Sequence, residues 1–215
     1  MTSQSTLNVL PFTLGDWQTN CYLTYVEGSR NCWLIDAGFG PQPMIDAVRE
    51  RGLEPSMLIL THAHLDHIAG VHEVRQAFPD LPIAIHSAEQ AFLTDPKLNL
   101  SAAIGMDLTA PPADRLLEHG ETLMLDGLSF EIRHTPGHSP GGISLYQPDS
   151  RVAFVGDALF AGSIGRTDFP TSDHDTLISA IREQLLSLPD DVQIFPGHMG
   201  PSTIGHERQA NPFLQ

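Results

Sequence analysis

The most informative stretch of the chain is Thr61-His62-Ala63-His64-Leu65-Asp66-His67-Ile68-Ala69-Gly70. It places three histidines and one aspartate within six residues, directly after the apolar run at 57–60. Neutral imidazole and carboxylate groups suit zinc, iron or manganese as ligands. Four such groups this close together would repel one another or lack partners without a metal. The stretch therefore predicts a metal site at the end of a buried strand.

Around this stretch, the pattern of apolar residues and turn signals predicts a mixed α/β protein. Strands are predicted at 7–14, 20–26, 32–36, 57–60, 82–85, 122–125, 128–133, 142–146, 151–155 and 192–195. Helices are predicted at 41–51, 69–78, 88–93 and 173–188. The alternation of strand and helix in the first half implies helices packed over a sheet. The segment 94–118 shows little periodicity, and a loop of this length is typical of a functional or mobile region.

Length, composition and charge narrow the function classes. The 215 residues fit a single domain spanning 1–215, and 41% hydrophobic with 17% charged residues is typical of a globular protein. The net charge of -15 argues against binding to nucleic acid, because phosphate contacts need clustered lysine and arginine. No signal-peptide pattern or apolar stretch of ~20 residues is present, so we expect a cytoplasmic protein without a membrane partner. The pattern carries no signal for an oligomeric state.

The two cysteines, Cys21 and Cys32, are not expected to react. If residues 20–36 form a hairpin that turns at Gly28-Ser29, the two are out of register and do not pair. Neither lies in a Cys-x-x-Cys motif, so buried thiols in a reducing compartment are the expectation.

Three later segments repeat one pattern, in which an apolar strand ends, glycine or proline turns the chain, and a ligand-type residue follows. They lead to Gly137-His138, Gly156-Asp157 and Gly197-His198. Ligand groups at the ends of adjacent strands can converge on one edge of a sheet. The pattern therefore adds three residues to the predicted metal site.

Seven candidate ligands exceed the four of one tetrahedral site and suit two metals that share a carboxylate and a water. We assign three histidines to the first metal, namely His62, His64 and His138. The second metal receives Asp66, His67 and His198, and Asp157 is the bridge. The expected cofactors are two divalent ions, zinc first, with iron or manganese as alternatives.

The motif His-x-His-x-Asp-His followed by three later ligands resembles the signature of the metallo-β-lactamase superfamily, over nearly the whole chain. That resemblance implies a four-layer αββα sandwich. Within the superfamily the chain is similar to the small bacterial type of hydroxyacylglutathione hydrolase (glyoxalase II), on segments 156–160, 165–170 and 205–213. Full-length members carry a C-terminal helical domain that supplies much of the glutathione-binding surface, and this chain ends at Gln215. The resemblance thus implies the metal chemistry more firmly than it implies glutathione as the thiol part of the substrate.

The implied reaction is hydrolysis of a small-molecule thioester, with glutathione as one candidate thiol. Two cations lower the pKa of a shared water, which attacks the thioester carbonyl, and a thiolate leaves without a dedicated acid. Asp66 and Asp157 are the predicted catalytic residues. Asp36 is expected, from the same resemblance, to orient a histidine ligand.

Other functions on the same residues stay open. Persulfide dioxygenases share the fold but use one iron, held by the residues that match His62, His138 and Asp157. A lactonase, a phosphodiesterase and a non-catalytic metal-binding protein are the further alternatives. A β-lactamase is disfavoured by the missing export signal and by the implied aspartate bridge.

Three cations are candidates for binding an anionic substrate group: Lys97, Arg115 and Arg166. For Arg166, a structural contact with Asp168 is an equal alternative. The remaining histidines are expected to lie outside the site, and they are His72, His86, His119, His134, His174 and His206.

Overall fold

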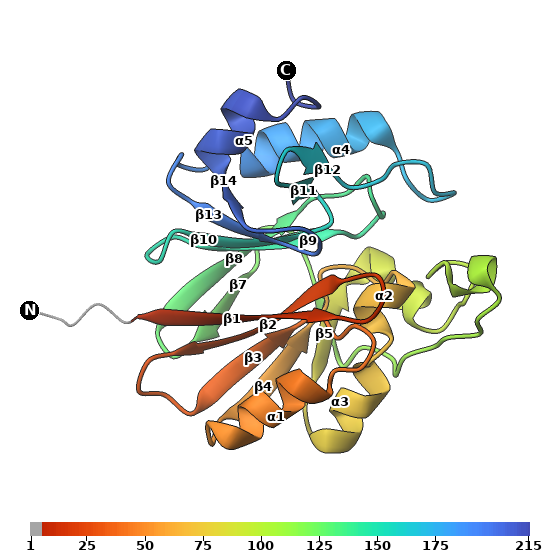
Figure 1. Ribbon diagram of the computed structural model, residues 1–215, viewed down its shortest axis with the longest axis vertical. Helices are drawn as coiled ribbons and strands as arrows, with labels where there is room; N and C mark the ends of the chain where they lie inside the picture. Colours follow the sequence, from red (N-terminus) through yellow and green to blue (C-terminus); the bar gives the residue numbers. More distant parts are fainter. Residues whose placement is uncertain (1–5) are drawn as a thin grey trace, which may run out of the picture.

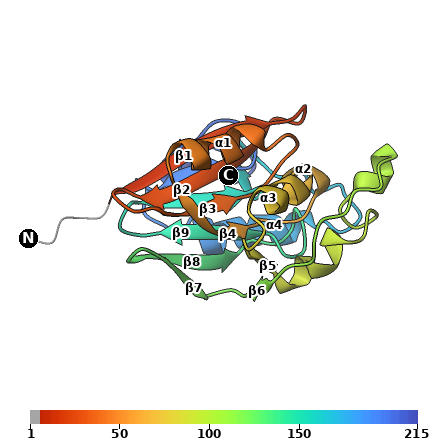
Figure 2. The same cartoon turned by 90° about the horizontal axis from the view of Figure 1, so that it is seen from below.

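The structure is a computed structural model, which describes residues 6–215. The fold has four layers. Two β-sheets are stacked at the centre, with helices on the outer face of each (Figure 1). These helices are α1 (Gln42–Glu50) and α3 (Val71–Ala77) on the first sheet, and α4 (His174–Ala180) and α5 (Ile204–Ala210) on the second. Figure 2 views the molecule from the side of α1 and α3. The predicted αββα sandwich is confirmed.

The first sheet has six strands in the order of the chain. They are β1 (Leu7–Leu14), β2 (Thr19–Val26), β3 (Asn31–Ile35), β4 (Glu54–Ile59), β5 (Ile83–His86) and β6 (Arg115–Leu117). The first three strands pair antiparallel, while β3 to β6 pair parallel. The parallel part needs crossovers, which α1, α3 and the segment 87–114 provide.

The second sheet also has six strands, in the order β14-β13-β10-β9-β8-β7. They are β7 (Thr122–Leu125), β8 (Leu128–His134), β9 (Ile143–Gln147), β10 (Val152–Gly156), β13 (Gln193–Pro196) and β14 (Ser202–Thr203). Only β10 and β13 pair parallel, because α4 crosses over between them. A separate hairpin is formed by β11 (Leu159–Phe160) and β12 (Ser163–Ile164).

Three layers of apolar side chains hold the four layers together, because successive residues of a strand point to opposite faces. On β3, Leu34 packs toward α1 and α3, whereas Trp33 points between the sheets. There its ring lies 5.0 Å from that of Phe130 on the second sheet. On the far side, Leu177 of α4 packs with Val155 of β10. Burying aromatic and aliphatic side chains of this size contributes about 1.5–3 kcal/mol each.

The segment of the ligand motif is itself helical, which the sequence prediction missed. A single turn, α2 (Leu65–Ile68), begins directly after His64, and the helix predicted at 69–78 starts only at Val71. The short helix predicted at 88–93 is a 3-10 helix at Ser87–Leu93. Four ligand-type residues in one short segment hide the apolar period from which a helix is recognised.

Later elements also differ from the prediction. The helix predicted at 173–188 is α-helical to Ala180 and continues as a π-helical turn at Ile181–Leu185, and its apolar residues Leu177, Ile181 and Leu185 are buried. The segment 94–118 contains a 3-10 turn at Ser101–Ile104 and strand β6. Strand β6 forms by pairing with the edge of β5, a contact distant in sequence that periodicity does not reveal. Helix α5, strand β14 and the β11–β12 hairpin were not predicted.

The cysteines lie as expected. Tyr25 is the partner of Cys32 in the β2–β3 ladder, so Cys21 is out of register, and both thiols are free and buried. Burial raises the pKa of Cys32 to about 12, which keeps the thiol protonated. No helix within residues 6–215 has the length and apolar character needed to cross a membrane.

Candidate metal centre

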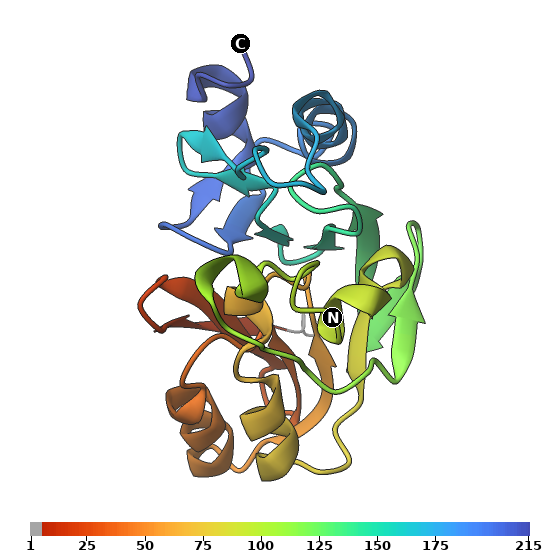
Figure 3. The same cartoon turned by 90° about the vertical axis from the view of Figure 1, so that its right-hand side faces the viewer.

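The seven predicted ligands come together at one edge of the sandwich, although they are spread over more than 130 residues of sequence. Their positions follow strand ends: His62 and His64 follow β4, Asp66 and His67 lie on α2, His138 follows β8, Asp157 follows β10 and His198 follows β13. Strands β8, β10 and β13 run in the same direction, so their carboxyl ends meet at this edge. Figure 3 turns the side that carries α2 toward the viewer.

The side chains form three overlapping groups whose donor atoms lie within 4.8 Å of one another. Two of them are the predicted sets: the histidine set (His62, His64, His138) and the mixed set (Asp66, His67, His198). The third joins Asp157 to one member of each. Asp157 Oδ2 lies 3.6 Å from Nε2 of His138 and 3.4 Å from Nε2 of His198. Asp157 thus lies between the sets, where the predicted bridge requires it.

The spacing and the unpaired atoms both fit bound cations. Ligand atoms around a tetrahedral zinc ion lie about 3.4 Å apart, given metal–ligand distances near ~2.1 Å. The carboxylate–imidazole pairs of the site are separated by 3.2 to 3.6 Å, which is long for a hydrogen bond. Among residues 6–215, buried Nε2 of His62, Nε2 of His67 and Oδ1 of Asp157 have no hydrogen-bond partner. Such orphaned atoms are costly unless something else binds them.

The histidine set is electrically neutral at pH 7. Burial lowers the pKa of His64 to about 3, and it lowers the pKa values of His62 and His138 as well. For His62 and His64, repulsion by neighbouring histidine rings adds to the effect of burial. The rings can therefore present lone pairs to a cation without losing a proton.

The mixed set is charged instead. Burial opposes a charge on His67, but the carboxylates of Asp66 and Asp157 outweigh it and raise the pKa of His67. The pKa of His198 is raised in the same way, with burial overcome by its contact with Asp66. Burial also opposes ionisation of Asp66, yet the nearby His67 and His198 lower its pKa below the usual range. Without a metal, this set is a cluster of imidazolium and carboxylate groups.

Asp36 contacts a histidine of the site, as the resemblance implies, and that histidine is His67. Its Oδ2 lies 2.8 Å from Nδ1 of His67, and because a carboxylate only accepts, Nδ1 donates and Nε2 faces the centre. The backbone N–H and the hydroxyl of Thr61 donate to the same carboxylate, each at 2.7 Å. Asp36 has a φ of 58°, a strained conformation typical of functional positions.

His138 is oriented by the segment that follows the β11–β12 hairpin. Its Nδ1 donates to the backbone carbonyl of Arg166 at 2.8 Å, which leaves Nε2 as the unprotonated nitrogen. The guanidinium of Arg166 binds Asp168 through two hydrogen bonds of 2.9 and 2.7 Å. The structural alternative for Arg166 is therefore realised.

Three residues that support the site were not found from the sequence. Glu89 is fully buried, and its carboxylate accepts from the backbone N–H groups of Ala63 at 3.1 Å and Gly141 at 2.8 Å. It thereby joins the loop of the first two histidines to the loop after His138. Thr19 donates to Asp66 at 2.8 Å. Tyr22 donates to the carbonyl of Pro196 at 2.6 Å. None of these residues belongs to a recognisable motif.

Gly197 is required by the closeness of the ligands. A Cβ at this position would lie 2.1 Å from Oδ1 of Asp157 and 2.7 Å from Cε1 of His67. The Pro196-Gly197-His198 turn can therefore approach the other ligands only with glycine at its centre.

A pocket of about 430 Å³ opens onto the metal centre. It is lined by Trp17, His64, Leu65, Asp66, Lys97, Leu100, Ala103, Ile104, His138, Asp157, Phe160, Arg166, Phe169, Pro170 and His198. The lining contributed by residues 6–215 contains no serine, threonine, cysteine or tyrosine. The pocket is thus mostly apolar, with ligands at its floor.

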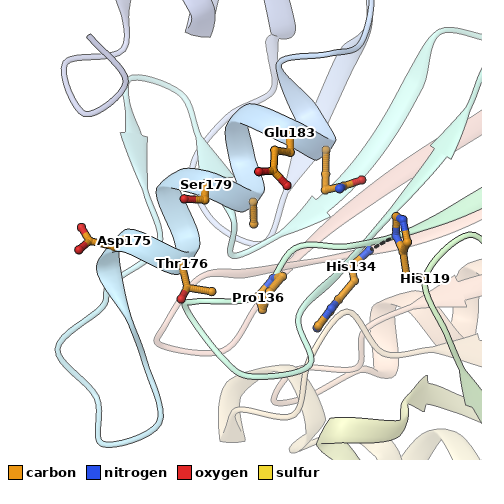
Figure 4. Close-up of a pocket in the computed structure, with 9 residues that line it drawn as sticks. His119, His134, Pro136, Asp175, Thr176, Ser179 and Glu183 are labelled. Carbon is orange, nitrogen blue, oxygen red and sulfur yellow. Dashed lines mark hydrogen bonds between the residues drawn. The ribbon is translucent and has the colours of Figure 1, made fainter.

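A second hollow, of about 470 Å³, lies between α4 and the end of β8 and contains none of the seven ligands (Figure 4). His119 and His134 line it, and the backbone N–H of His134 donates to Nδ1 of His119 at 3.2 Å. The ring of His134 stacks on His86 and its Nε2 lies 2.9 Å from the carbonyl of Pro140. These three histidines lie outside the metal centre, as expected.

Comparison with known proteins is consistent with this geometry. Residues 14–198 match the model of the metallo-beta-lactamase superfamily. The chain is 40% identical to hydroxyacylglutathione hydrolase GloC of Haemophilus influenzae over 210 residues, which cover 97% of each protein.

Two solved structures are similar over nearly the full chain. BLEG-1 B3 metallo-beta-lactamase is 39% identical with a TM-score of 0.91, and the match covers 96% of this chain and 99% of that one. TTHA1623 in a di-iron-bound form is 38% identical with a TM-score of 0.84, and the match covers 96% and 100%. The relatives thus include a protein named as a hydroxyacylglutathione hydrolase, one named as a metallo-beta-lactamase and one solved in a di-iron-bound form.

Proposed function

This chain belongs to the metallo-beta-lactamase superfamily of metal-dependent hydrolases, and from that premise we propose that it is a binuclear thioesterase acting on S-acylglutathione-type thioesters. The observation that carries the proposal is the position of Asp157 between the histidine set and the mixed set. A carboxylate shared by two ligand sets suits a pair of cations. The similarity to the Haemophilus hydrolase supports the thioester as substrate.

The residues divide the work of hydrolysis. Two divalent cations held by the seven ligands would supply hydroxide at neutral pH and polarise the scissile carbonyl. Asp66 and Asp157, the proposed catalytic residues, line the same pocket and have lowered pKa values, so each carboxylate can accept a hydrogen bond from the attacking water and orient it. Thr19 holds Asp66 in that orientation.

The composition of the pocket favours direct attack by water on a substrate with a good leaving group. No hydroxyl or thiol side chain lines the described pocket, so an acyl-enzyme route has no nucleophile there. A thiolate, with a parent pKa near ~8.5, leaves with little help from a general acid. A thioester therefore fits a site that has metal ligands but no dedicated acid.

The test is elemental analysis of the purified protein together with hydrolysis of S-lactoylglutathione and a panel of small thioesters. We expect two metals per chain, zinc or iron, and thiol release that disappears after removal of the metals by a chelator. Two metals without thioester hydrolysis would contradict the proposal.

The same preparation tests the other functions. Hydrolysis of a β-lactam is the second candidate function, favoured by the similarity to BLEG-1 B3 metallo-beta-lactamase. A chromogenic cephalosporin would detect this activity. One iron per chain with oxygen consumption on glutathione persulfide would instead indicate a dioxygenase. Lactones and phosphodiesters complete the panel.

A further inference from the structure

We propose that Lys97 determines substrate specificity by binding an anionic group of the substrate away from the scissile bond. This inference rests on the thioesterase function proposed above and assigns the substrate to the class of anionic thioesters. It is carried by the charge, position and surroundings of this one side chain.

Lys97 is the only lysine among the 215 residues, in a chain with a net charge of -15. It lines the pocket that opens onto the metal centre. Within residues 6–215, no carboxylate lies within ion-pairing distance of its ammonium group. An unpaired cation in the pocket of an acidic protein is available to an anionic ligand.

The other two candidate cations are already engaged. Arg166 forms a bidentate ion pair with Asp168, and its guanidinium lies 4.6 Å from the centre of the Phe169 ring. Arg115 pairs with Glu121 and does not line the pocket. Lys97 is therefore the pocket cation whose charge is uncompensated.

The backbone around Lys97 is fixed relative to the ligands. Its N–H donates to the side chain of Asp95 at 2.8 Å. Two residues on, the fully buried Asn99 donates from its side chain to the carbonyls of Phe92 at 3.1 Å and Leu108 at 2.9 Å. The carbonyl of Asn99 accepts from Leu65, the first residue of the helical turn that carries two ligands. The segment that carries Lys97 is thus joined by a hydrogen bond of Asn99 to the helical turn on which Asp66 and His67 lie.

The surroundings of Lys97 favour binding of an anion. Leu100 and Ile104 belong to the same wall of the pocket, and Phe169 lines it as well. Lys97 is itself exposed, so its ammonium group is accessible to an anion that enters the pocket, and the apolar neighbours offer a surface for the uncharged part of the same ligand. The two carboxylates that line the pocket, Asp66 and Asp157, are candidate ligands. Two divalent cations would more than neutralise them, so they would not repel an anionic substrate.

The experiment compares S-lactoylglutathione with its dimethyl ester, in which both carboxylates are neutral. For Lys97→Met we expect KM for the acid to rise about tenfold, the size of one charge-assisted contact, with kcat changed by less than about twofold. KM for the diester should stay constant, and Lys97→Arg should restore most of the affinity for the acid. Arg115→Met is the matched control, because it removes the same charge outside the pocket.

A second measurement uses the unaltered protein. Since the chain has one lysine, an amine-acylating reagent has a single side-chain target, and mass spectrometry follows its modification. We expect N-acetyl-S-methylglutathione, which keeps both carboxylates but has no amine or thiol to consume the reagent, to slow modification of Lys97, and added salt to weaken this protection.

The outcomes separate the two proposals. If the protein hydrolyses both thioesters but Lys97→Met leaves KM for the acid unchanged, or raises it equally for the diester, the role of Lys97 is wrong and the thioesterase stands. If the protein hydrolyses neither thioester, the proposed function is wrong, and the role of Lys97 is wrong with it.

Discussion

The histidine set and the mixed set lie side by side in one centre, yet they differ in burial and in charge. Each side chain of the histidine set is buried, and their pKa values are lowered, so the rings are neutral. The mixed set borders the pocket, with Asp66 and His198 partly exposed, and its histidines have raised pKa values. The first set is ready for a cation at neutral pH, whereas the second must release protons to accept one.

Because of this difference, we expect the histidine set to hold a cation firmly and the mixed set to hold a more labile one. In the empty histidine set, Nδ1 of His64 lies 2.8 Å from Nε2 of His138, but the set carries no charge that must be neutralised before a cation binds. The mixed set compensates its own charges in the absence of a metal, and that compensation competes with binding. We therefore expect the two positions to fill in order, the histidine set first.

The largest effect should come from Asp157, which contacts both sets. Asp157→Ala removes the shared carboxylate and should lower turnover by at least about a thousandfold, since the charge of both cations then lacks its common partner. Metal content should fall below two per chain. Elemental analysis and thioester hydrolysis check both expectations. Full activity with two bound metals would show that Asp157 is not the bridge.

The next prediction separates the sets by removing one histidine from each. His64→Ala should empty the histidine set, leave well under one metal per chain because the mixed set is the weaker of the two, and lower turnover about a hundredfold or more. His198→Ala should leave the histidine set filled and yield about one metal per chain. Metal counting on both variants checks this. His206→Ala, an exposed histidine outside the centre, is the control and should retain two metals. Equal losses in both variants would remove the distinction between the sets.

The pH dependence of metal affinity should also differ. His67 is protonated at neutral pH because its pKa is raised, and the pKa of His198 is raised as well, so a metal must displace at least one proton, and affinity at the mixed set should fall by at least about tenfold per unit as pH drops. With a pKa of about 3, His64 stays neutral, so the histidine set should hold its affinity between pH 7.5 and 6. Calorimetric titrations at several pH values check this, and parallel slopes would contradict it.

A smaller effect is expected from Asp36, which contacts only the mixed set. Asp36→Asn keeps the shape but weakens the hold on Nδ1 of His67, so affinity at the mixed set should drop about 10- to 100-fold. The histidine set should be unaffected, as competition titrations with a chelator would show. Asp46→Asn, on the exposed face of α1, is the matched control.

The seven candidate ligands could be selected from the sequence because the cluster at 62–67 follows an apolar strand and the other three follow an apolar strand and a glycine turn, and these features are local. The fold class was accessible for the same reason, since the strands of both sheets show clear apolar patterns. The supporting residues were not accessible. Glu89 contacts Ala63 and Gly141, which lie 26 and 52 residues away, and nothing near Glu89 in the sequence indicates either partner.

The pocket shows the same division between local and distant information. Lys97 and Arg115 are equivalent in the sequence, since both lie in the segment 94–118, whereas Arg166 has Asp168 two residues away. Their partners distinguish them: Arg115 and Arg166 are neutralised by acids that fold beside them, while Lys97 is not. Short strands such as β6 were missed because pairing with a distant neighbour stabilises them more than their own residues do.

The smallest effect should come from Glu89, which supports only the histidine set. Burial raises the pKa of Glu89, although two backbone N–H groups donate to its carboxylate. In Glu89→Gln the amide NH₂ would face one of these donors, at a cost of about 1–3 kcal/mol in the free energy of unfolding. Because the two loops that it joins carry His62, His64 and His138, affinity should fall a few-fold at the histidine set alone. Thermal unfolding and chelator competition measure the two effects, with the exposed Glu118→Gln as control. An equal loss at the mixed set would mean that Glu89 supports the whole centre rather than one side of it.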